Sequence, residues 1–137
     1  LMSKFKKHAI IKDINAKFTG RLAYAEMVGL LNTCDIAINP ISKGAAQSII
    51  NKHGDYAAAG LPVLNTQECR EYRNLVDEYQ MGFNCENNNS EDLAEKILTV
   101  YKDEALRKQM SHNSRKLAEE KFDRGVTYKK IVDLITE

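Results

Sequence analysis

The chain has 137 residues, and 20 Lys and Arg stand against 19 Asp and Glu, so its formal net charge is +1. This length predicts one domain, and the near-neutral charge argues against a dedicated nucleic-acid binder, which needs a strong basic excess. No apolar run approaches the roughly 18 residues of a transmembrane helix. Three widely spaced cysteines fit no disulfide or zinc pattern, so we expect reduced thiols in a cytoplasmic protein, with Cys34 in the core.

Short β-rich segments alternate with segments of helical periodicity through the first two thirds of the chain. In chain order the pattern predicts a strand at 16–20, a helix at 22–33, a strand at 35–40, a helix at 50–59, a strand at 62–66, a helix at 68–79 and a strand at 82–86. Gly60 is typical of the position just past a helix, and Pro62 is tolerated as the first residue of a strand.

The last third of the chain is helical. Residues 87–90 predict a polar turn and a helix cap, followed by helices at about 91–101, 103–121 and 124–135. In the last helix we expect Ile131, Leu134 and Ile135 to face inward. The chain shows no linker, so residues 1–137 are predicted to form one unit.

This order of elements predicts an α/β fold with a Rossmann-like parallel sheet, helices on both of its faces and further helices at the C-terminus. In such sheets ligands bind beyond the carboxyl ends of the strands. The loops that follow the strands are therefore the places to look for a site.

The loop after residues 35–40 has the composition of an anion site. Gly44, Ala45 and Ala46 are small enough to let a ligand approach the backbone, and the next helix would offer free N–H groups to a diphosphate. Lys52 could add a positive charge, and Asp55 is an acceptor suited to a ribose diol. An ordinary loop with a solvated lysine and a capping aspartate is the alternative interpretation.

Several segments resemble one family. Residues 51–64 (NKHGDYAAAGLPVL) resemble the NK-x-x-(D/E)-Y-x-A-x-G-x-P-V segment of GT-B glycosyltransferases of the group 1, family 4 type, which are retaining enzymes of bacterial polysaccharide synthesis, including O-antigen and lipopolysaccharide. Further resemblances, in the family's order, are in residues 18–22 (F-x-G-x-L), 34–40 (C-D-I-x-I-x-P), 82–97 (G-x-x-C through L-A-x-x-I) and 122–134. The resemblance covers nearly the whole chain.

The resemblance implies a donor site. The family's Glu-x7-Glu pair places its ribose-binding acid at Asp55, five residues before Gly60, and its first acid at Gln47. This chain therefore departs from the pattern at both positions. Aspartate keeps the charge with a shorter reach, whereas Gln47 loses the charge and keeps an acceptor oxygen.

The same resemblance implies roles for other residues. Lys52 would face the donor diphosphate and, with Gln47, belong to the catalytic set, while Leu22 would offer backbone groups to the nucleobase. The backbone of Gly44, Ala45 and Ala46 would cradle the phosphates. No cofactor and no metal ion are expected, because protein cations replace the divalent ion in GT-B enzymes.

The implied function is transfer of a hexosyl or N-acetylhexosaminyl group from a nucleoside diphosphate, with UDP favoured, to a polysaccharide or a lipid-linked acceptor. A non-catalytic nucleotide-binding or assembly module, which Gln47 favours, and a nucleotide-sugar epimerase of the same fold are alternatives. A receiver-type signalling domain is disfavoured, because the paired acids after a first strand are missing.

The resemblance also implies that the N-terminal acceptor domain and the first strands of this domain lie outside residues 1–137. We therefore expect a partial donor domain that is inactive alone and forms a homodimer or exchanges strands. Residues 1–21 hold six basic residues and one acidic residue, a balance of +5. This cluster fits peripheral contact with the inner face of an anionic membrane, or a solvated helix face. His53 could touch a phosphate or act as a capping or surface histidine.

Overall fold

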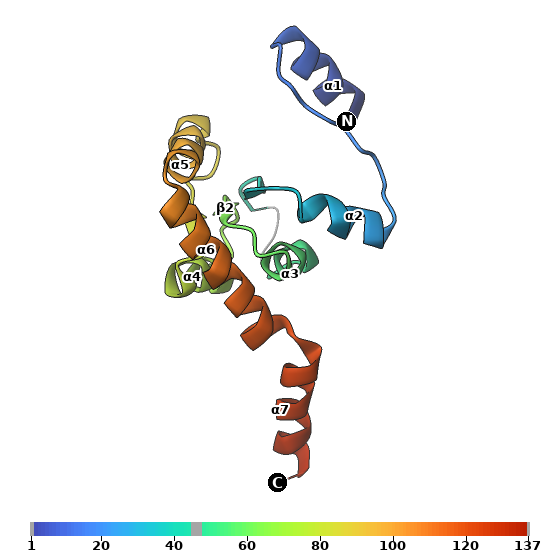
Figure 1. The fold of residues 1–137 in the computed structure, drawn as a ribbon, viewed down its shortest axis with the longest axis vertical. Coiled ribbons are helices and arrows are strands. Elements are labelled where there is room, and N and C mark those ends of the chain that lie inside the picture. The colour runs from blue at the N-terminus through green and yellow to red at the C-terminus, as the bar shows by residue number, and fades with distance from the viewer. Residues whose placement is uncertain (1, 45–47, 137) are drawn as a thin grey trace.

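The computed structural model describes residues 2–44 and 48–136. A central body holds a small sheet with helices packed around it, and one helix projects from each end (Figure 1). The sheet has three parallel strands in the order β1-β2-β3. The predicted α/β class and the parallel sheet are thus confirmed.

The elements follow one another in this order: α1 (Met2–Ile11), α2 (Tyr24–Leu31), β1 (Ala37–Asn39), α3 (Asn51–Ala58), β2 (Val63–Asn65), α4 (Arg70–Tyr79), β3 (Gly82–Asn84), α5 (Ser90–Lys102), α6 (Glu104–Leu117), a π-helical turn η1 (Ala118–Phe122) and α7 (Arg124–Thr136). Within residues 2–44 and 48–136, no helix combines the length and the apolar character that crossing a membrane requires.

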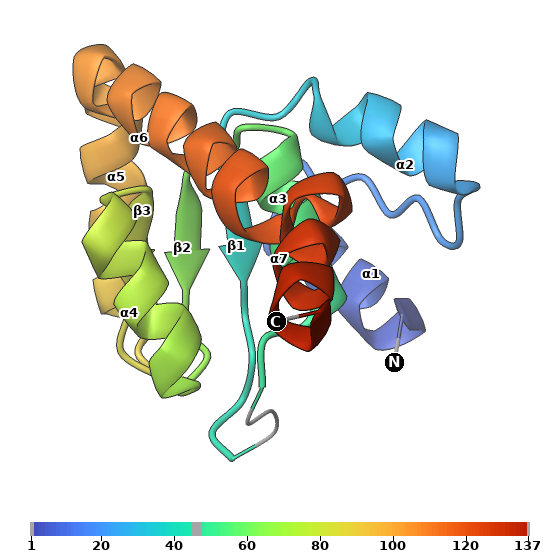
Figure 2. The ribbon, with the colours of Figure 1, turned by 90° about the horizontal axis from the view of Figure 1, so that it is seen from below.

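Helices cover both faces of the sheet, because successive strand residues point to opposite sides. On one face Val63 packs in a buried cluster with Ala57 of α3, Val76 of α4 and Leu117 of α6. On the other face Leu64 joins a second cluster, whose other buried members are Cys85, Val100 and Met110. Figure 2 shows the sheet between these layers, with α6 running along one end.

The strand predicted at residues 16–20 is wrong. These residues form no strand, and they belong to the segment that links α1 to α2. A strand is stabilised by hydrogen bonds to a neighbouring strand. No strand within the described residues lies beside this segment, so its β-rich composition has nothing to pair with.

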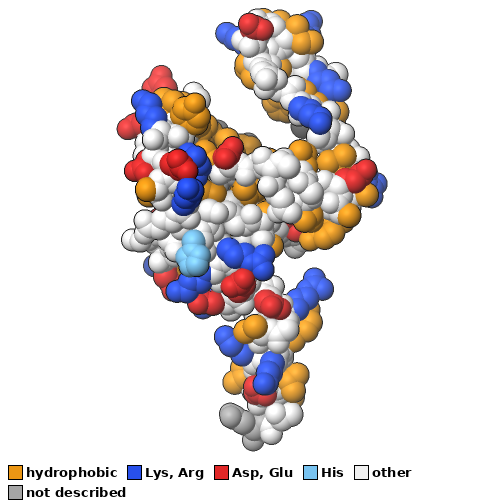
Figure 3. Space-filling view, in the orientation of Figure 1, with side chains coloured by type: hydrophobic (Ala, Val, Ile, Leu, Met, Phe, Trp, Pro, Cys, Tyr) orange, Lys and Arg blue, Asp and Glu red, His pale blue; other side chains and the backbone are white. Residues whose placement is uncertain are grey.

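Both projecting helices expose apolar side chains. Ile131, Leu134 and Ile135 of α7 were expected to face inward, but 51%, 76% and 78% of their surfaces are exposed. The physical reason is that α7 extends away from the sheet beyond η1, so no described element covers it (Figure 1). Figure 3 shows hydrophobic side chains on α7 and on α1 at opposite ends of the molecule. Cys34 is likewise exposed rather than in the core, because it follows α2 at the surface.

Gly82 begins β3 at the closest approach of two strands. It pairs with Val63 in the parallel register, and a Cβ atom added to Gly82 would overlap the Val63 carbonyl group. Backbone atoms cannot move aside as a flexible side chain can. Only glycine therefore fits here without shifting β2 relative to β3.

We predict that Gly82→Ala lowers the free energy of unfolding by about 1 to 3 kcal/mol, the usual cost of forcing extra volume into a packed site. The matched control is Gly29→Ala in α2, where an added Cβ meets no atom within 4 Å. The control should be neutral or stabilising by up to about 1 kcal/mol, since alanine favours helix. Urea denaturation measures both, and equal stability of the two variants would contradict the prediction.

Candidate functional site

Three asparagines form a ladder across the carboxyl ends of the strands. Asn39, Asn65 and Asn84 occupy equivalent register positions as the last residues of β1, β2 and β3. The amide nitrogen of Asn39 donates to Oδ1 of Asn65 at 3.0 Å, and the amide nitrogen of Asn65 donates to Oδ1 of Asn84 at 3.0 Å. Each strand end is thus joined to the next by a side chain as well as by the backbone.

The neighbours of Asn65 set the direction of this ladder. The Gln67 N–H donates to Asn65 Oδ1 at 3.1 Å, while Asn65 Nδ2 donates to the Gln67 carbonyl at 3.2 Å. Rotating the Asn65 amide by half a turn would place its oxygen against the Gln67 carbonyl oxygen and its NH₂ against the Gln67 N–H, which are two repulsive contacts. The group that Asn39 presents to Asn65 is therefore its NH₂.

The ladder continues into α3 through His53. Asn39 Nδ2 lies 2.8 Å from His53 Nε2, and the His53 ring stacks on Tyr72 of α4 with the ring centroids 3.5 Å apart. Because Asn39 presents its NH₂, Nε2 must accept, which requires a neutral ring. Burial, and to a smaller extent the charge of Lys52, lowers the pKa of His53 from 6.5 to about 4.

His53 is therefore a buried side chain with a structural role in the first turn of α3. Its surface is fully covered, and its Nδ1 lies 3.4 Å from the Ile50 amide nitrogen, one residue before the helix begins. Because the ring accepts at Nε2, its proton is on Nδ1, so Nδ1 cannot accept from the Ile50 N–H and this contact is not a capping hydrogen bond. The surface position expected from the sequence is wrong, because the side chain fills the space between α3, α4 and the end of β1.

A second set of hydrogen bonds ties together the loops that follow the strands. The Thr66 hydroxyl accepts from the Ile41 N–H at 2.8 Å and lies 3.0 Å from the Asn39 carbonyl oxygen. Asn87, beyond β3, donates through Nδ2 to the carbonyls of Ile41 at 2.7 Å and Thr66 at 2.9 Å. The start of the loop after β1 is therefore fixed to both neighbouring loops.

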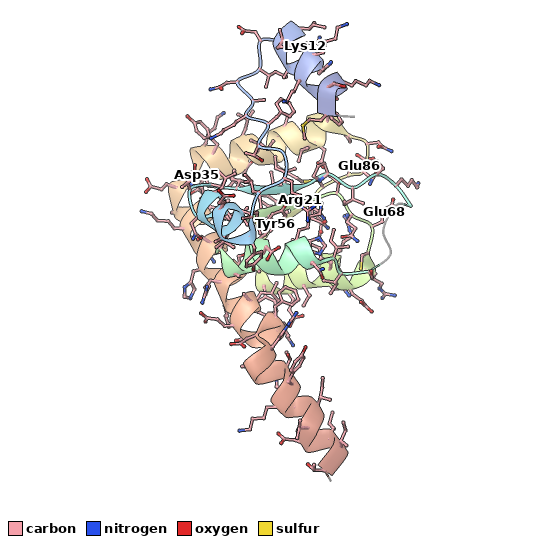
Figure 4. The ribbon with its side chains drawn as sticks, turned by 90° about the vertical axis from the view of Figure 1, so that its right-hand side faces the viewer. Lys12, Arg21, Asp35, Tyr56, Glu68 and Glu86 are labelled. Atoms are coloured by element: carbon pink, nitrogen blue, oxygen red, sulfur yellow. The ribbon has the colours of Figure 1, made fainter. Side chains whose placement is uncertain are left out.

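The carboxylate of Glu68, in the segment between β2 and α4, faces the tip of that loop, and the sequence analysis missed it. Gly44 has a φ of +70°, and its N–H faces Oε2 of Glu68 at 3.4 Å. Figure 4 shows Glu68 beside this loop, while Asp35 lies at the opposite end of β1. A phosphate held by the Gly44 backbone would have to displace this carboxylate. Ala45, Ala46 and Gln47 lie outside the described residues.

The outer face of α3 lines an open hollow of about 920 Å³. Asn51, Asp55 and Ala58 follow one another at helical spacing on this face, whereas His53 and Ala57 are buried against the body. Gly54 of α3 also lines the hollow. The hollow is completed by residues from α2, from the segment before α3, and from the region where α6, η1 and α7 meet: Tyr24, Ile49, Ile50, Arg115, Ala118, Glu119, Phe122, Asp123 and Arg124.

Asp55 has a partner in this hollow that the sequence did not reveal. The Tyr24 hydroxyl, at the first residue of α2, donates to Asp55 Oδ1 at 3.1 Å. This bond and the negative charge of Asp55 raise the pKa of Tyr24, so its phenol stays protonated. The first turn of α3 contains no acidic residue, which leaves its N-terminal N–H groups without a negative neighbour on the helix itself.

The other predicted site residues lie near this hollow without lining it. Lys52 is half-buried in the first turn of α3, next to the face that carries Asp55. Leu22, also half-buried, precedes α2 by two residues. The roles assigned to Lys52, Asp55, Leu22 and Gly44 stay predictions. Within the described ranges 2–44 and 48–136, no group of three or more His, Cys, Asp or Glu side chains could hold a metal ion.

Comparison with protein-family models identifies the family of this chain. Residues 3–117 match the model for glycosyl transferases group 1, so the chain belongs to this glycosyltransferase family. The match spans every element from α1 to α6, including the ladder, the loop after β1 and Asp55. Searches among curated proteins and among solved structures gave no match.

We predict that the neutrality of His53 makes stability depend on pH. A histidine whose pKa is lowered by folding is protonated more readily in the unfolded chain, so stability is complete above pH 6.5 and falls as the pH drops toward 4. The loss can reach about 3 kcal/mol over that range. Urea denaturation at a series of pH values measures it.

The control for this prediction is His112→Gln, because His112 is exposed on α6. This variant should keep the pH dependence of the parent, whereas His53→Gln should flatten it. If His53→Gln does not fold, NMR titration of the parent imidazoles replaces it. A His53 ring that titrates near pH 6.5 would contradict the prediction.

Proposed function

We propose that this glycosyltransferase chain binds a nucleoside diphosphate sugar, with UDP as the favoured nucleotide, in the hollow beside α3. The observation that carries the proposal is that Asp55 and the N-terminal end of α3 line the same open space. A carboxylate suits the hydroxyls of a ribose, and free helix N–H groups suit a diphosphate. The volume of about 920 Å³ is within the usual range for small-molecule sites.

In the proposed reaction the bond between the anomeric carbon and a diphosphate oxygen breaks, and the diphosphate leaves with the electron pair. An acceptor hydroxyl oxygen bonds to the same carbon, and its proton passes to the leaving diphosphate. Negative charge grows on the leaving diphosphate, where the N-terminus of α3 and Lys52 stabilise it. Removing one such donor commonly costs about 10²–10³ in rate.

The finer assignments also belong to this proposal. We place the chain in the retaining, GT-B, family 4 type, with a hexosyl or N-acetylhexosaminyl donor and a polysaccharide or lipid-linked acceptor, as in O-antigen and lipopolysaccharide synthesis in bacteria. The support is the order of the motifs around residues 18–22, 34–40, 51–64 and 82–97. Protein cations rather than a metal ion would bind the diphosphate. We place the protein in the cytoplasm, with the basic residues of α1 available for peripheral contact with the membrane.

A second candidate function is a nucleotide-binding module without catalysis. Gln47 favours it, because the family pattern has an acid at this position and an amide cannot take over a role that needs a charge. Both functions predict binding of the nucleotide. Only transfer or hydrolysis of a UDP-sugar would distinguish them.

We predict that the chain binds UDP more tightly than uridine, and that Asp55→Asn and Lys52→Ala each weaken UDP binding by about tenfold. The size follows from losing one hydrogen bond to a charged group. Isothermal titration calorimetry measures the dissociation constants. Lys52→Ala should also reduce the difference between UDP and uridine, since the lysine acts on the phosphates.

Matched controls come from α7, where Asp133→Asn and Lys129→Ala make the same changes of charge on exposed positions away from the hollow. These variants should bind UDP as the parent does. If the parent does not bind UDP, or if both site variants bind it as tightly as the parent, the proposed site is wrong.

A further inference from the structure

Tyr24 and Asp55 meet across the hollow from two separate elements. Tyr24 begins α2 and Asp55 is in the middle of α3, 31 positions later, yet the phenol oxygen lies 3.1 Å from Asp55 Oδ1. Both side chains line the same open space. The hydroxyl of Tyr24 is the only partner recorded for the Asp55 carboxylate within the described residues.

Tyr24 is held in place by its own element. The Glu26 carboxylate accepts from the Ala23 N–H at 3.0 Å, which fixes the first turn of α2 around Tyr24. At the other end of α2, Leu31 packs against the core cluster of the body. Tyr24 as a residue is 70% exposed, so its side chain makes little contribution to the core.

A single hydrogen bond to Oδ1 restrains the Asp55 carboxylate and leaves it able to accept further hydrogen bonds. A carboxylate has two oxygens with about four acceptor positions, so Asp55 keeps Oδ2 and part of Oδ1 for a ligand. Aspartate has a shorter reach than glutamate, and a short side chain that turns away from the ligand cannot compensate by bending. The orientation of Asp55 therefore decides whether it can meet a diol.

We propose that Tyr24 is a positioning residue that holds the Asp55 carboxylate toward the hollow and thereby makes this site selective for ribonucleotides over deoxyribonucleotides. This inference rests on the proposed function, because it assigns a purpose to Asp55 in that same site. Tyr24 acts through Asp55 and not by touching the diphosphate. The hydroxyl, and not the ring, is the part that matters.

The test compares UDP with 2′-deoxy-UDP by titration calorimetry. The parent should bind UDP more tightly. Tyr24→Phe removes only the hydroxyl and should weaken UDP binding by about three- to tenfold, the effect of leaving one side chain to be ordered on binding, while 2′-deoxy-UDP binding changes less than about twofold. Asp55→Asn should remove the preference for UDP, and adding Tyr24→Phe to it should cost nothing more.

The matched control is Tyr128→Phe, which removes an exposed hydroxyl on α7. It should change neither dissociation constant. Because Tyr24 is mostly exposed, Tyr24→Phe should keep the melting temperature of the parent. An NMR titration adds a readout that needs no ligand, since Asp55→Asn should lower the raised pKa of the Tyr24 phenol toward 10.0.

The outcomes separate the two proposals. A parent that does not bind UDP overturns the proposed function, and with it the inference. A parent that prefers UDP, loses this preference with Asp55→Asn and keeps it with Tyr24→Phe leaves the proposed function standing and overturns the inference. Equal weakening of both nucleotides by Tyr24→Phe also overturns it, since Tyr24 would then act on a part of the ligand that the two share.

Discussion

The arrangement of this molecule depends on the amide side chain of Asn65. Buried at the end of the central strand, it joins Asn39 on one side to Asn84 on the other, and the backbone of Gln67 fixes its direction. That direction makes His53 an acceptor and therefore neutral. The Asn65 side chain thus sets the hydrogen bonding of all three strand ends and keeps the His53 ring, in the first turn of α3, neutral.

The consequence for function is the rotation of α3. Because His53 and Ala57 face the body, the helix can only present Asn51 and Asp55 to the outside, where Tyr24 and the meeting point of α6 and α7 complete the hollow. The buried and the open faces of one eight-residue helix are therefore determined together. The ladder positions a carboxylate that it never touches.

Local signals in the sequence predicted much of this fold. Gly60 lies just past the end of α3 as predicted, whereas β2 begins at Val63, one residue after the predicted first position at Pro62. Asn89 caps α5 by accepting from the N–H groups of Glu91 and Asp92. The segment at 16–20 and the inward face of α7 could not be predicted in this way, because a strand needs a partner and a buried face needs a cover. Both depend on what lies alongside in space.

The site was predicted in part for the same reason. Asp55 could be assigned from its spacing in the sequence, five residues before Gly60. Its hydrogen bond to Tyr24 joins residues 31 positions apart, and no local sequence pattern predicts it. The ladder was partly visible in the sequence, since three predicted strands each contain an asparagine near the carboxyl end. Only the register of the sheet shows that these three side chains touch.

The most direct test of the central claim is an NMR titration of the ¹⁵N-labelled chain with UDP. The account predicts amide shift changes concentrated at Asn51, Gly54 and Asp55 on the outer face of α3 and at Tyr24. Changes confined to a second hollow, around Gln80 and Asn113, or no change at saturating nucleotide, would contradict it.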